Sequence, residues 1–175
     1  MVYILGIDIG TSGTKTALFD YKGNVKASYT EEYELLSPSN GYAEQHPEDW
    51  WNATVHGIKE VIYKSGINSA DIKGIGLSGQ MHGLVMLDEK NEVIRNAIIW
   101  CDQRTAKECD EITEKVGKER LIEITANPAL TGFTASKILW VKNNEPRNYE
   151  RCKHILLPKD YIRFKLTGEY ATEVS

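Results

Sequence analysis

The residues with the clearest chemical potential form the octapeptide DIGTSGTK, Asp8 to Lys15. Its glycines let backbone N–H groups approach phosphate oxygens, and its three hydroxyl side chains add donors. A carboxylate at the end of an apolar strand is costly to bury unless it meets a cation. Asp8 would therefore suit a hydrated Mg²⁺ carried by a nucleotide, as both a catalytic and a metal-binding residue. The expected cofactor contacts are Gly10, Thr11, Ser12, Gly13, Thr14 and Lys15.

This octapeptide is not a P-loop. In a P-loop the lysine follows a glycine directly, whereas Thr14 stands between Gly13 and Lys15. A P-loop also opens a helix, but the residues around this turn predict two strands. The alternative is an ordinary hairpin in which Asp8 is a turn aspartate and Lys15 a solvent-facing strand lysine.

A second group of polar residues occurs in SGQMHG, Ser78 to Gly83. Gln80 and His82 can form hydrogen bonds with hydroxyl groups, and the Met81 thioether can contact carbon faces. These three residues suit a polyol. The alternative is a polar strand end with a histidine whose hydrogen bonds are satisfied within the protein.

A third group follows an apolar segment in IIWCDQRT. Trp100 offers an aromatic face close in sequence to the carboxylate of Asp102 and the guanidinium of Arg104. Such combinations commonly hold sugars. Neither polar group alone is enough to predict a sugar site. Together with the DIGTSGTK hairpin, the two groups favour a sugar site made of Gln80, Met81, His82, Trp100, Asp102 and Arg104.

The pattern of elements predicts an α/β domain with a mixed sheet. Residues 2–9, 14–20 and 25–35 form an expected antiparallel meander, and residues 37–46 an expected polar loop. GIGLSG, Gly74 to Gly79, has GxGxxG spacing, but a strand and not a helix is expected after it, so we reject a dinucleotide site. Further strands are expected in 71–79, 82–88, 96–100 and 154–158, and helices in 47–66, 104–117, 133–145 and 158–167.

Composition excludes several classes of protein. The 175 residues carry a net charge of −4, which favours neither nucleic acid nor an anionic membrane as a partner. No apolar run approaches the roughly 20 residues that span a bilayer, and the N-terminus has no signal-peptide pattern. Three cysteines without CxxC spacing indicate thiols in a reducing cytoplasm rather than disulfides or a zinc site.

Five stretches in chain order together resemble the FGGY family of carbohydrate kinases. They are LGIDIGTSGTK, GLSGQMHGLVMLD, AIIWCDQRT, NPALTGFTASKILWVKNNEP and LLPKDYIRFKLTGE. The nearest resemblance within the family is to members that phosphorylate D-xylulose. Ribulose, gluconate, fuculose and glycerol kinases remain alternatives, as does a non-catalytic sugar-binding module.

The resemblance implies the ribonuclease-H-like fold of the actin and hexokinase superfamily, with ATP and Mg²⁺ as cofactors. It assigns Asp8 to the metal at the ATP phosphates, residues 11–13 to the phosphate hairpin, and Met81 and His82 to the sugar. The family's catalytic base is an aspartate in a glycine-rich segment beyond LTGE, and most ATP contacts come from a C-terminal domain. We therefore expect residues 1–175 to be an incomplete N-terminal kinase domain, inactive alone. The resemblance is also compatible with a homodimer.

Overall fold

The computed structural model describes residues 1–172, which divide into two compact units. The first unit contains Met1–Leu35, His46–Gln80 and residues 158–172. The second unit contains Leu36–Gln45 and Met81–Leu157. The chain therefore passes between the units four times, and each unit is assembled from segments that are distant in sequence.

The first unit is built on a four-stranded mixed sheet in the order β3-β2-β1-β5. Its strands are β1 (Tyr3–Ile9), β2 (Gly13–Asp20), β3 (Val25–Glu32) and β5 (Ile72–Gly79). β1, β2 and β3 pair antiparallel as a meander, whereas β5 joins β1 in parallel. Because β1 is central, its residues pair with β2 on one side and with β5 on the other.

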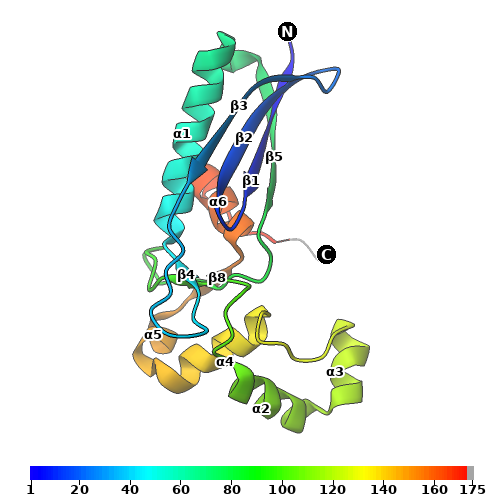
Figure 1. The fold of residues 1–175 in the computed structure, drawn as a ribbon, viewed down its shortest axis with the longest axis vertical. Coiled ribbons are helices and arrows are strands. Elements are labelled where there is room, and N and C mark those ends of the chain that lie inside the picture. The colour runs from blue at the N-terminus through cyan, green and yellow to red at the C-terminus, as the bar shows by residue number, and fades with distance from the viewer. Residues whose placement is uncertain (173–175) are drawn as a thin grey trace. The chain divides into compact units, whose positions relative to one another are not determined.

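One long helix covers a face of this sheet. α1 (Pro47–Ser65) packs against β2 and β3, and Figure 1 shows it running along the strands. Pro47 occupies the first turn, and Gly66 ends the helix in a left-handed conformation with φ of 67°. The core between helix and sheet contains Tyr3, Leu5, Leu18 and Val61. The 3₁₀ turn η1 (Ser69–Asp71) leads into β5, and α6 (Pro158–Thr167) packs against β5, β1 and α1.

The second unit combines two small sheets with four helices. β4 (Glu44–Gln45) pairs with β7 (Ala97–Ile98), and β6 (Val85–Leu87) pairs with β8 (His154–Leu156), both antiparallel. The helices are α2 (Ala106–Val116), α3 (Lys118–Thr125), α4 (Thr134–Asn144) and α5 (Pro146–Arg151). Leu84, Met86, Ile98 and Val141 form the core, so both small sheets and α4 contribute to it.

The expected elements are present, with differences in extent. The meander, the strand at 71–79 and the helices α1, α2, α4 and α6 confirm the sequence prediction. The strands expected at 82–88 and 96–100 are shortened to three and two residues. α3, α5 and η1 were not predicted, and β4 lies in the expected loop. Among residues 1–172, no helix is long and apolar enough to cross a membrane.

The packing of α1 on the sheet can be tested with two valines. Val61 on α1 is 0% exposed, whereas Val25 on β3 is 57% exposed. Val61→Ala should lower the free energy of unfolding by about 1–3 kcal/mol, because it removes buried methyl groups and leaves a cavity. Val25→Ala should change it by about 0.5 kcal/mol or less. Urea denaturation measures both, and equal losses would contradict this account of the core.

Candidate functional site

Asp8 lies on the face of the sheet opposite the α1 core. Its neighbours Ile7 and Ile9 are buried, while Asp8 itself is exposed, as strand alternation requires. Asp8 stands across from Lys15 on β2 and from Ser78 on β5. The Ser78 hydroxyl donates a hydrogen bond of 2.5 Å to the Asp8 carboxylate. The three side chains line one open hollow of about 370 Å³ on this face of the sheet.

The turn between β1 and β2 is fixed by hydrogen bonds to its backbone. The Gly10 N–H donates to the Gly13 carbonyl at 3.0 Å, and the Tyr33 hydroxyl donates to the Gly10 carbonyl at 2.6 Å. The backbone N–H of Gln80 donates to the Ile9 carbonyl at 2.7 Å. The end of β5 and the residue that follows β3 therefore hold the hairpin in shape.

Gly13 is required by close packing and not by an unusual φ. A Cβ atom at this position would lie 2.5 Å from the carbonyl oxygen of Glu31 on β3. Any larger residue would push β3 away from the turn, so the glycine keeps the hairpin close to its neighbour.

The predicted phosphate contacts do not all share the hollow. Lys15 lines it beside Asp8, and Ser12 is exposed in the turn. Thr14 is almost completely buried on the other face, where its hydroxyl lies 3.3 Å from the Tyr33 hydroxyl. The geometry therefore gives Thr14 a role in fixing the hairpin, whereas the side chains of Ser12 and Lys15 are exposed donors.

The donor set around Asp8 fits one kind of metal site. Among residues 1–172, no group of three or more His, Cys, Asp or Glu side chains could hold a metal ion. A single exposed carboxylate next to a hydroxyl fits a Mg²⁺ ion that keeps most of its waters and arrives with a nucleotide. It does not fit a cation held entirely by protein ligands.

Met81 and His82 begin the second unit, directly after Gln80. Met81 is 55% exposed, and His82 has a left-handed backbone with φ of 59°. This conformation costs about 1–2 kcal/mol for a residue with a side chain, so contacts must maintain it. The His82 ring packs on the Phe133 ring with centroids 4.3 Å apart. Burial, and then the charge of Lys137, lower the pKa of His82 below its ordinary value, which favours the neutral ring.

Asp102 and Arg104 form a buried ion pair. Asp102 is 0% exposed and accepts hydrogen bonds from the Ala43 N–H at 2.7 Å and from the Arg104 guanidinium at 2.7–3.0 Å. A guanidinium nitrogen of Arg104 also lies 2.8 Å from Glu44. Trp100, by contrast, is 42% exposed. Of these predicted contacts, Trp100 is available to a ligand, whereas Asp102 and Arg104 are engaged within the protein.

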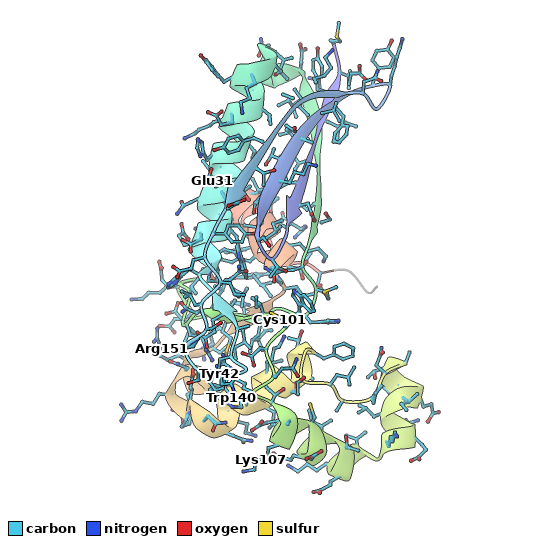
Figure 2. All side chains as sticks on the ribbon, viewed as in Figure 1. Glu31, Tyr42, Cys101, Lys107, Trp140 and Arg151 are labelled. Carbon is cyan, nitrogen blue, oxygen red and sulfur yellow. The ribbon has the colours of Figure 1, made fainter. Side chains whose placement is uncertain are left out.

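Aromatic rings surround the Arg104 guanidinium. It lies 3.8 Å from the centroid of the Tyr42 ring and 4.8 Å from that of Trp140. Figure 2 shows Tyr42 next to Trp140, and their rings meet edge to face with centroids 6.1 Å apart. This packing lowers the cost of burying the charge and fixes the loop that carries Trp100.

Sequence reasoning did not assign roles to three residues that shape these sites. Ser78 and Tyr33 hold Asp8 and the hairpin turn, and Lys137 bonds the His82 carbonyl. Ser78 could have been found, because parallel pairing of β1 with β5 sets it beside Asp8. Tyr33 and Lys137 act on backbone carbonyls through tertiary contacts, which leave no pattern in the sequence.

Comparisons with known proteins show which proteins the chain resembles. The chain is 47% identical over 175 residues to the xylulose kinase of Bacillus subtilis (strain 168). This match covers 100% of the present chain and 35% of that protein. The solved xylulose kinase of Rhodospirillum rubrum matches with a TM-score of 0.92 and 27% identity, over 98% of this chain and 35% of that one. The gluconate kinase of Lactobacillus acidophilus matches with a TM-score of 0.88 and 30% identity, over 96% and 34%.

These similarities establish the class of protein. The fold is the ribonuclease-H-like α/β fold of the sugar kinases, as the sequence predicted. The chain belongs to the FGGY family of carbohydrate kinases, and residues 3–175 match the N-terminal domain of that family. It spans about a third of the length of the curated relatives that it matches.

The buried ion pair gives a test of whether Asp102 is structural. Asp102→Asn should lower the free energy of unfolding by about 3–5 kcal/mol, because it leaves Arg104 buried without its closest counter-charge. Asp110→Asn is the matched control on the exposed side of α2 and should cost about 0.5 kcal/mol or less. Urea denaturation at pH 7 measures both. An Asp102→Asn protein with unchanged stability would contradict this structural role.

Proposed function

We propose that the chain is the N-terminal part of an ATP-dependent kinase that phosphorylates D-xylulose to D-xylulose 5-phosphate. One observation carries the proposal: Asp8, Lys15 and Ser78 line one open hollow on the sheet of a chain that belongs to the FGGY family. The names of the relatives support the choice of sugar. A reducing cytoplasm is the compartment we propose, and the three free cysteines are compatible with it.

In this proposal each residue of the first unit acts by position and charge. Asp8 would hold Mg²⁺, which when bound offsets the negative charge of the ATP phosphates. Ser78 orients the Asp8 carboxylate by donating a hydrogen bond to it from the hydroxyl group. Lys15, Ser12 and the backbone of the turn would contact phosphate oxygens, as glycine-rich hairpins do.

The sugar would bind to residues of the second unit. The neutral His82 ring can both donate and accept one hydrogen bond with sugar hydroxyls. The exposed side chains of Met81 and Trp100 offer apolar contacts to the carbon faces. Asp102 and Arg104 would hold the Trp100 loop in place without touching the sugar.

The role of Asp8 can be tested in the complete protein that carries this sequence. Asp8→Asn should lower kcat for D-xylulose-dependent ADP formation by about 100-fold or more, because the amide cannot hold the metal with a negative charge. EDTA should abolish turnover, and added Mg²⁺ should restore it. Asp71→Asn is the control. Asp71 directly precedes the first residue of β5, whereas Ser78 lies near the last residue of that strand. Unchanged kcat in Asp8→Asn would contradict the role.

The choice of sugar needs a separate experiment. Wild-type protein is assayed with D-xylulose, ribulose, gluconate, fuculose and glycerol, and we expect the largest kcat/KM with D-xylulose. His82→Ala should raise the KM for that sugar by about 10-fold, as loss of a hydrogen-bonding partner costs about 1.4 kcal/mol, and should leave the KM for ATP within about 2-fold. Preference for another sugar would reassign the substrate, while sugar binding without turnover would favour a binding module.

A further inference from the structure

Lys137 on α4 is a fully buried lysine with an unusual set of partners. Its side chain is 0% exposed. The ammonium donates hydrogen bonds to the backbone carbonyls of His82 at 2.7 Å and of Gly132 at 2.6 Å. Lysine is almost never fully buried unless it is paired, so a buried ammonium directed at two backbone carbonyls requires an explanation.

The first carbonyl belongs to the residue with the left-handed backbone. His82 has φ of 59°, and its carbonyl accepts from Lys137 and also from the Thr134 hydroxyl at 3.2 Å. The ring of the same residue packs on Phe133. α4 and the residue before it therefore hold His82 by both its backbone and its side chain.

The second carbonyl belongs to a loop that lies against Trp100. A Cβ atom on Gly132 would stand 2.7 Å from the carbonyl oxygen of Trp100, so only glycine fits there. By bonding Gly132 and His82 together, the Lys137 ammonium links the loop beside Trp100 to the Met81–His82 segment. It thus joins the backbone of His82, which the sequence predicted to hold a sugar, to the backbone of the loop that lies against Trp100.

Several charged or titratable groups surround this ammonium. Burial lowers the pKa of Lys137 to about 8, although Asp102 and Cys101 favour its charge, and Arg104 opposes it. Burial also raises the pKa of the Cys101 thiol above its ordinary value of 9.0, and lowers that of His82 below 6.5. Both shifts move the pKa values of these two neighbours away from that of Lys137.

We propose that Lys137 is a positioning residue of the sugar site, whose ammonium fixes His82 and the loop beside Trp100 through their backbone carbonyls. This inference rests on the proposed function, because it assumes that His82 and Trp100 contact the sugar. Lys137 itself is buried and does not touch the ligand. Loss of its charge should loosen the sugar site and leave the phosphate hairpin of the first unit intact.

A nuclear magnetic resonance titration of ¹⁵N-labelled wild-type protein tests the backbone link without any substitution. The N–H groups of Gly83 and Phe133 share peptide bonds with the His82 and Gly132 carbonyls. Both amide signals should shift with a common midpoint near pH 8, as Lys137 loses its proton and the charge-assisted hydrogen bonds weaken. If the two amides do not share a common midpoint, the inference is wrong.

Enzyme kinetics test the consequence for the sugar. Lys137→Met removes the charge at nearly constant volume and should raise the KM for D-xylulose by about 10- to 100-fold, with the KM for ATP within about 2-fold. In the wild type the sugar KM should rise above pH 8, because the lysine is charged only below its pKa, whereas in Lys137→Met it should stay high and flat. Lys137→Arg keeps a charge and should lie closer to the wild type.

Lys142→Met is the matched control, because Lys142 lies on the exposed side of the same helix. It should leave both KM values and the pH profile unchanged. A Lys137→Met protein with a wild-type sugar KM and only reduced thermal stability would overturn the positioning role. If the wild type phosphorylates no sugar, the proposed function fails instead, and the amide titration still decides whether Lys137 holds the two carbonyls.

Discussion

The alternation of side chains along β1 is the constraint on which the first unit depends. Ile7 and Ile9 must be buried against the core under α1, so the residue between them must face the other way. Asp8 is that residue, and its exposure follows from the burial of its neighbours. Pairing then fixes which side chains can meet it, because Lys15 and Ser78 occupy the facing positions of β2 and β5. A shift of one residue in either pairing would separate these groups.

In the second unit, by contrast, charged side chains are buried together. Arg104 is buried together with Asp102 and Glu44, and the Tyr42 and Trp140 rings cover its guanidinium. A buried ion pair adds little net stability, but removing one partner is costly, so such a network fixes one arrangement of its loops. Here the arrangement holds the loop that carries Trp100. The Trp100 side chain on this loop is 42% exposed.

The sequence predicted the first unit well because its signals are local. Strand alternation, the YKGN turn and the capping residues Pro47 and Gly66 each depend on neighbours a few positions away. The division into two units was not visible, since the chain crosses between them four times and no linker marks the crossings. α3 and α5 escaped prediction because they are short and have no fully buried residues. The expectation that Asp102 and Arg104 contact the sugar came from their residue types and their position after an apolar segment, and neither of these reports burial.

The segment from Ser78 to His82 leads from the first unit into the second. Ser78 orients Asp8, and the N–H of Gln80 bonds the Ile9 carbonyl next to the hairpin turn. The following two residues belong to the second unit, where His82 takes a backbone conformation that its side chain disfavours. A free loop would relax from that conformation, because no contacts would offset its cost in free energy. It persists here because Lys137 and Thr134 bond the His82 carbonyl, so the lasting strain at His82 is the physical reason to look for function at this segment.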